Sequence, residues 1–95
     1  MASANVVKYS LSSNTWTKVA NGVSSSITFQ NLGQNPIYVQ FSNTGLAPSS
    51  NVGIVYNSWQ GELKKSITDL TYITSPNTVF ARSITSLGAV VVEFS

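Results

Sequence analysis

Hydrophobic and polar residues alternate along two neighbouring stretches of the chain, residues 26–30 and residues 37–42. An alternation of period two is typical of a β-strand that buries one face. The intervening residues 31–36 read Asn-Leu-Gly-Gln-Asn-Pro, and such residues favour a turn because Gly and Asn tolerate positive φ and Pro fixes its own φ. The sequence therefore predicts an antiparallel hairpin over residues 26–42, whose apolar face must be covered by a second sheet.

Further extended segments are predicted on both sides of this hairpin, at residues 6–11, 15–19, 53–56, 68–74, 78–84 and 88–94. The dipeptide Asn21-Gly22 predicts a type I′ turn that leads into a strand beginning at Val23. Residues 62–67 alternate poorly, so we expect a charged edge strand or a bend there, with its lysines discouraging edge-to-edge pairing. In the last segment one face is predicted to carry Val90, Val92 and Phe94, and the other Ala89, Val91 and Glu93.

Together these segments amount to about eight short strands at regular spacing, without a convincing helix. They predict an all-β fold, a single-domain antiparallel β-sandwich of jelly-roll-like type. A length of 95 residues leaves room for one domain, residues 1–95. Residues 1–5 are expected to form a flexible N-terminal arm. The longest predicted loop covers residues 43–51, and long loops often carry function.

The composition narrows the range of partners. Charged residues make up 8% of the chain and the net charge is +2. The five cations are scattered, with only Lys64 and Lys65 adjacent, so the basic stripe that nucleic-acid binding requires is missing. No apolar run approaches the roughly 18 residues of a membrane span, and the N-terminus lacks signal-peptide character. We therefore expect synthesis in a cytoplasm and neither a nucleic acid nor a membrane as partner.

The chain offers little catalytic chemistry, because it contains no histidine and no cysteine. A Ser-His nucleophile and a thiolate metal site are therefore excluded. The only carboxylates are those of Glu62, Asp69 and Glu93. Convergence of Glu62 and Asp69 with a lysine in a cleft would be needed for acid–base chemistry, and solvated surface charge is the preferred interpretation. We expect no enzymatic activity, no metal and no cofactor.

Aromatic residues are the remaining candidates for a functional role. The phenylalanines, together with Trp16, are predicted to lie in the core, where they bury large areas. Trp59 stands in a predicted turn among Asn57, Ser58 and Gly61, a position that is harder to bury. It is either packed at an edge of the core or exposed as a protein-contact anchor or a sugar-stacking platform.

Several stretches together resemble small all-β structural proteins of tailed bacteriophages, of the head decoration or cement type. The resemblance spans most of the chain and rests on residues 16–22 (Trp-Thr-Lys-Val-Ala-Asn-Gly), 27–41, 63–70, 79–83 (Val-Phe-Ala-Arg-Ser) and 89–93 (Ala-Val-Val-Val-Glu). Each motif is a strand-and-turn pattern rather than a chemical signature. Where such proteins carry a glycine-rich turn before Val79, this chain has Ser-Pro-Asn at residues 75–77.

The resemblance implies a non-enzymatic virion protein, made in the host bacterial cytoplasm, that binds the outer capsid shell in many copies and stabilises it. Its partner would be the major capsid protein or another virion protein, and it would form a homo-oligomer, a dimer or a trimer. Repetition on a lattice lets modest contacts act together. The candidate contact residues lie in the N-terminal arm, the long loop and the predicted Trp59 turn: Asn5, Leu46, Pro48, Tyr56 and Trp59.

Two other classes of function stay open. The first is a tail or fibre component that binds a host-surface carbohydrate through Trp59, Tyr56 and the polar loops. The second is a free-standing β-sandwich binding module with a specific partner.

Overall fold

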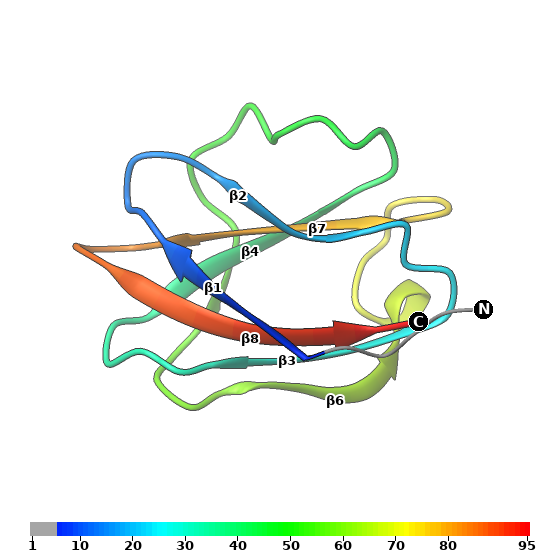
Figure 1. The fold of residues 1–95 in the computed structure, drawn as a ribbon. Helices are drawn as coiled ribbons and strands as arrows, with labels where there is room; N and C mark the ends of the chain where they lie inside the picture. Colours follow the sequence, from blue (N-terminus) through cyan, green and yellow to red (C-terminus); the bar gives the residue numbers. More distant parts are fainter. Residues whose placement is uncertain (1–5) are drawn as a thin grey trace.

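A computed structural model describes residues 6–95 as two antiparallel four-stranded sheets packed face to face (Figure 1). This confirms the predicted all-β sandwich. The elements are β1 (Val7–Leu11), β2 (Thr17–Asn21), β3 (Ser26–Asn31), β4 (Ile37–Ser42), β5 (Ile54–Tyr56), β6 (Gly61–Ser66), the 3₁₀ helix η1 (Ile67–Asp69), β7 (Thr78–Ser83) and β8 (Gly88–Phe94).

The strand order is that of a jelly roll. Sheet A has the order β1-β8-β3-β6, and sheet B the order β2-β7-β4-β5. Every connection except that between β4 and β5 therefore crosses from one sheet to the other. Eight strands wound in this way as two facing sheets form the double-sheet jelly-roll arrangement.

The hairpin predicted for residues 26–42 is wrong, because β3 and β4 lie in different sheets. β3 pairs with β6 and β8, whereas β4 pairs with β5 and β7. Both strands do bury the faces that their alternation predicted. Those faces oppose each other across the core instead of lying side by side, since alternation specifies the buried face and not the neighbouring strand.

The hairpin predicted at Asn21-Gly22 is also wrong. Gly22 does adopt the left-handed region, with φ of 80°. However, the amides of Gly22 and Val23 both donate to the carbonyl of Asn77 at 2.9 Å, which leads the chain out of sheet B towards sheet A. Gly22 therefore has the positive φ that the predicted turn requires, but Asn21 does not, and the connection joins the two sheets instead of two neighbouring strands.

The edge strand anticipated for residues 62–67 is confirmed as β6, whereas the extended segment predicted for residues 68–74 is wrong. The chain instead forms η1, in which the Leu70 amide donates to the Ile67 carbonyl at 3.1 Å. Ile67 is buried and Leu70 packs against the core. Apolar residues three apart fit the period of a 3₁₀ turn better than the alternation of a strand.

The core between the sheets is formed by inward-facing side chains of both, including Leu11, Ile27, Phe29, Ile37, Val39, Val79, Val90 and Val92. The predicted alternation of β8 is confirmed at Val90 and Val92, which are buried, whereas Ala89, Val91 and Glu93 are half-buried. Phe94, predicted on the buried face, is half-buried and packs against the core. Phe80 is buried as well, but it points to the outer face of sheet B, where the Lys18 ammonium lies 5.9 Å from its ring centroid. The core therefore contains fewer phenylalanines than the sequence predicted.

The outer face of sheet B carries the β4–β5 loop, drawn in green at the top of Figure 1. The indole N–H of Trp16 donates to the Ser50 carbonyl at 2.9 Å, and the Arg82 guanidinium donates to Asn51 Oδ1 at 3.3 Å. Arg82 also stacks on Trp16, with its Cζ atom 5.5 Å from the ring. Trp16, predicted in the core, is thus half-buried outside it and holds this loop against the sheet.

The Trp16–Ser50 bond should contribute to the stability of the loop. We expect Trp16→Phe, which keeps a ring beside Arg82 but removes the donor, to lower the free energy of unfolding by about 1 kcal/mol. Hydrogen exchange in residues 49–52 should rise at the same time. The matched control is Trp59→Phe, since the Trp59 indole is exposed and donates no hydrogen bond within residues 6–95. Equal effects of the two changes in urea unfolding would contradict this role of Trp16.

Candidate functional site

The structure separates the residues that the sequence singled out. Trp59 is 63% exposed in the turn between β5 and β6, and Leu46 is 73% exposed in the β4–β5 loop, where Pro48 is half-buried. Tyr56 is buried, so its ring does not offer the contact surface that was expected. Asn5 lies outside the described residues. Leu46 lies in the connection from β4 to β5 within sheet B, whereas Trp59 lies in the connection from β5 to β6 of sheet A, and we therefore treat the Trp59 turn separately.

Trp59 occupies a backbone conformation that rarely holds a bulky residue. The Gln60 amide donates to the Asn57 carbonyl at 3.0 Å, which closes a β-turn with Trp59 at its third position. There the φ of Trp59 is 69°, in the left-handed region that favours glycine. A strained residue persists only where its surroundings fix it, and such residues concentrate at functional positions. An exposed indole in this conformation is accordingly the leading functional candidate.

The turn is tied to β3 by three hydrogen bonds. The Trp59 amide donates to the Asn31 carbonyl at 2.9 Å, and the Asn31 amide donates to the Gln60 carbonyl at 2.9 Å. The side-chain amide of Gln30 donates to the Trp59 carbonyl at 3.0 Å. These hydrogen bonds therefore hold the backbone on both sides of the Trp59 side chain.

The side chain of Asn31 extends this framework into the core, where it is fully buried. Its Nδ2 donates to the carbonyls of Asn35 (2.9 Å) and Tyr56 (3.1 Å), and its Oδ1 accepts from the Gly33 amide at 2.9 Å. One amide thus joins the β3–β4 connection to the end of β5. The sequence predicts only a turn at Asn31, although its place two residues after Phe29 puts it on the inward face of β3.

Gly61 allows the turn to enter β6 directly beside β3. A Cβ atom at this position would lie 1.9 Å from the Phe29 carbonyl oxygen, a distance that no side chain permits. The short stretch from Asn57 to Gly61 therefore combines a turn, a strained tryptophan and a glycine required by close approach. The sequence showed these residues but not the backbone contact that demands the glycine.

Tyr56 supports the site from inside. Its ring packs edge-on against Phe29, with centroids 4.9 Å apart at 80°, and its hydroxyl donates to Glu62 Oε2 at 3.1 Å. Burial, followed by the negative charge of Glu62 and the hydrogen bond to it, raises the pKa of Tyr56 to about 12. The phenol is therefore a neutral donor that holds Glu62, the second residue of β6, against the core.

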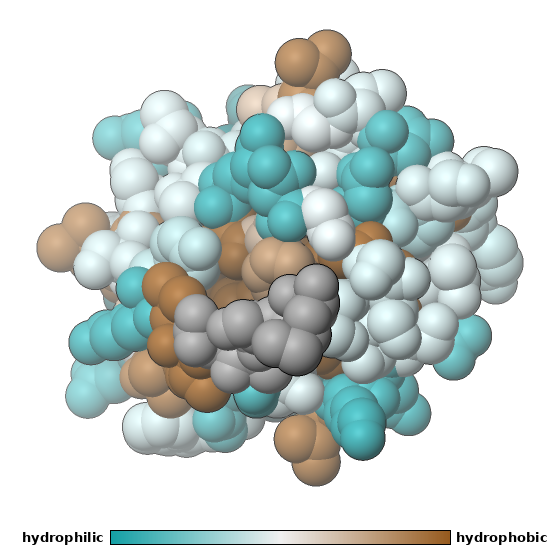
Figure 2. Space-filling view, turned by 45° about the vertical axis from the view of Figure 1, so that its right-hand side comes forward, coloured by the Kyte–Doolittle hydropathy of each residue, from teal (hydrophilic) through white to brown (hydrophobic). Residues whose placement is uncertain are grey.

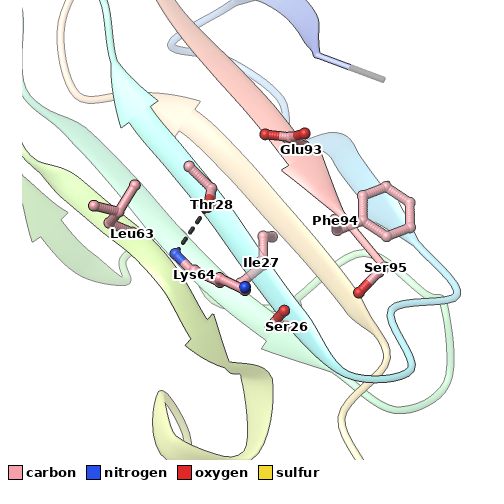
Figure 3. A pocket seen from close by; sticks show the side chains of 8 residues that line it. All are labelled: Ser26, Ile27, Thr28, Leu63, Lys64, Glu93, Phe94 and Ser95. Atoms are coloured by element: carbon pink, nitrogen blue, oxygen red, sulfur yellow. Dashed lines mark hydrogen bonds between the residues drawn. The ribbon is translucent and has the colours of Figure 1, made fainter. Parts of the chain in front are cut away.

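The outer face of sheet A is hollowed along β3, towards the end of that strand remote from the turn (Figure 3). Thr28 and Ser26 of β3 lie between Leu63 and Lys64 of β6 and Glu93 of β8, and the Lys64 amide donates to Thr28 Oγ1 at 2.8 Å. A second hollow shares Thr28 and Leu63 with the first and reaches Trp59. We call this area the β3–β6 surface, defined by Ser26, Thr28, Gln30, Trp59, Leu63 and Lys64.

The β3–β6 surface combines apolar area with hydrogen-bonding groups. Leu63 is 79% exposed, so together with Trp59 it offers two large uncovered side chains at one edge of sheet A. Hydroxyls and an amide lie between them and β8. On the face seen in Figure 2, apolar side chains form a larger group as well as single spots among polar ones. A tryptophan beside a leucine with polar neighbours is the composition of a contact surface.

Within residues 6–95 no group of three or more Asp and Glu residues gathers to hold a metal ion. The same residues contain no helix long and apolar enough to cross a membrane.

Comparison of the chain with protein-family models, with curated proteins and with solved structures found no match. The resemblance to phage decoration proteins accordingly rests on the strand and turn patterns of the sequence.

Asn31 should be indispensable to the turn. In Asn31→Asp the two donated hydrogen bonds become contacts between a buried carboxylate and two carbonyl oxygens. We expect the free energy of unfolding to fall by roughly 3–5 kcal/mol, the usual cost of an uncompensated buried charge. Asn21→Asp, at an exposed position, is the matched control and should change it by less than about 0.5 kcal/mol. Similar losses in both variants would argue against the role given to Asn31.

Stability should fall in strongly alkaline solution because of Tyr56. Its pKa is raised from 10.0 to about 12 in the folded protein, so the folded state keeps the proton that the unfolded chain releases above pH 10. The contribution of Tyr56 to the free energy of unfolding is therefore fully present below pH 10 and is lost as the pH rises to 12. Tyr56→Phe should flatten this decline, whereas Tyr72→Phe, at a fully exposed position, should leave it unchanged. Urea unfolding at several pH values provides the measurement.

Proposed function

We propose that this chain is a non-enzymatic structural protein of a bacteriophage virion, made in the host bacterial cytoplasm, which decorates the outer capsid shell in many copies and stabilises it. Its partner is the major capsid protein or another virion protein, and copies of the chain associate with one another. The β3–β6 surface is the part of the molecule that we assign to the shell.

The observation that carries this proposal is the exposed indole of Trp59, which projects from a backbone held by hydrogen bonds to β3. Tryptophan is enriched among residues that dominate the energy of protein contacts. Ordering a flexible side chain or loop on binding costs free energy, and a turn that is already fixed avoids part of that cost. Trp59 is 63% exposed and its backbone is hydrogen-bonded to β3 on both sides, so it is arranged in advance for a partner.

The low charge supports assembly on a lattice. With a net charge of +2, neighbouring copies repel one another only weakly. Where many copies bind one shell, contacts that are modest individually act together. A polar, weakly charged jelly roll therefore suits a repeated position on a large surface.

A carbohydrate-binding component of a tail or fibre is the second candidate. The observation that favours it is the proximity of the Trp59 indole to the Thr28 hydroxyl and the Gln30 amide along one hollow. An aromatic ring offers an apolar face to the C–H groups of a sugar, and the polar side chains offer hydrogen bonds to its hydroxyls. The carbohydrate-binding candidate uses the same surface as the shell-binding one. The two are therefore distinguished by the number of copies per particle and by the ligand that is bound.

Quantitative mass spectrometry on gradient-purified particles tests the proposal. We expect a copy number comparable to that of the shell protein. A handful of copies per particle would favour the tail component and a glycan-binding assay. Absence from the particles would overturn the virion proposal and favour a free-standing binding module.

Binding to shells that lack this protein tests the assigned surface. Trp59→Ala should weaken binding about 30-fold or more, as expected for removal of a dominant contact residue. Leu87→Ala, which truncates a 78% exposed leucine in the β7–β8 turn, is the matched control and should bind like the unmodified chain. Equal affinity of both variants, with unchanged circular dichroism, would remove the β3–β6 surface from the proposal.

A further inference from the structure

Three of the four edge strands carry features that hinder pairing with another chain. β6 has an irregular register with β3, a positive φ of 49° at Lys64, and two adjacent lysines. β2 has an irregular register with β7 between Lys18 and Ala20. β5 is only three residues long. Edge strands with a bulge, a lysine pair or very short length are poor templates for strand addition.

The fourth edge strand, β1, carries a single lysine, Lys8, but has no bulge and no lysine pair. It pairs with β8 in continuous register from Val7–Val92 to Leu11–Gly88, without a bulge. It contains no proline or glycine, and its inward-facing residues Val7 and Tyr9 are not charged. Within residues 6–95, β8 is the only strand beside it, so its other edge presents unpaired backbone groups. Val7 remains 42% exposed, which leaves apolar area uncovered at that edge.

We infer that β1 pairs with β1 of a second copy of this chain, antiparallel about a two-fold axis. The two copies of sheet A then form one continuous eight-stranded sheet. A two-fold axis makes the interface self-complementary, because each copy offers the same edge. This inference does not depend on the proposed virion function.

Charge and side-chain direction select the register. Directly opposed residues in antiparallel strands point to the same face of the sheet. With the axis at Tyr9, all five residues of β1 pair: Lys8 lies opposite Ser10 of the second copy, and Val7 opposite Leu11. Moving the axis to Lys8 would oppose two ammonium groups, which is unfavourable. The register centred on Tyr9 therefore gives the longest pairing without like charges opposed.

The pairing covers little area, so the dimer is weak. Five residues per copy bury less than the roughly 1,600 Å² of a standard protein interface. We therefore expect the dimer to form at a protein concentration of about 100 µM and to dissociate on dilution. On a particle lattice, high local concentration would favour the same contact.

Analytical ultracentrifugation of the complete chain tests the dimer. At about 100 µM we expect a mass twice the 10.2 kDa of one chain. Val7→Lys places an inward-pointing charge at the β1 edge and should weaken association at least tenfold. Val55→Lys makes the same change at a 47% exposed position of edge strand β5 and should not. The inference would be overturned if the chain were a monomer at every concentration, or if the two lysine substitutions weakened association equally. Either outcome is independent of the number of copies found in particles.

Disulfide trapping tests the register without relying on stability. The chain has no cysteine, so each introduced thiol is unique. A disulfide needs Cα atoms within about 7 Å, which opposed residues satisfy and residues offset by two positions do not. Oxidising a mixture of Lys8→Cys and Ser10→Cys chains should give the mixed dimer in excess, and Ser10→Cys alone should react slowly. Random distribution of products would contradict the register centred on Tyr9.

Discussion

The buried side chain of Asn31 is the interaction on which the proposed functional surface depends. A fully buried amide must satisfy its hydrogen-bonding groups within the protein, and this one does so with Gly33, Asn35 and Tyr56. Its backbone meanwhile bonds both to Trp59 and to Gln60. One residue therefore links the β3–β4 connection, the end of β5 and the turn that presents the indole. The strained conformation of Trp59 is maintained by this network.

The jelly-roll winding places this network and the open edge on different sides of sheet A. Since the order is β1-β8-β3-β6, the turn that precedes β6 lies at one edge and β1 at the other. A chain can therefore use the β6 side for a foreign surface and the β1 side for a second copy. Both contacts would be modest, which suits a protein that acts through repetition.

The sequence predicted the fold class and the burial of most strand faces, but not the strand partners. Alternation at Ile37 and Val39 identified a buried face, yet nothing local specified that this face would meet β3 across the core. The turn residues around Trp59 made it hard to bury, but they left open whether it packs at an edge of the core or is exposed. The importance of Asn31 and Gly61 was not predicted, because both depend on backbone groups that are distant in sequence or brought close by strand pairing. Trp16 was misplaced for a similar reason, since its partner Ser50 lies in a distant loop.

Hydroxyl-radical footprinting of the chain, free and bound to particle shells, tests the central claim most directly. It reports the solvent exposure of individual side chains, and the exposed residues Trp59, Leu63, Leu46 and Leu87 are all distinguishable by position. We predict that oxidation of Trp59 and Leu63 falls on binding, while that of Leu46 and Leu87 is unchanged. Protection of Leu46 with continued oxidation of Trp59 would contradict the account and move the contact to the β4–β5 loop.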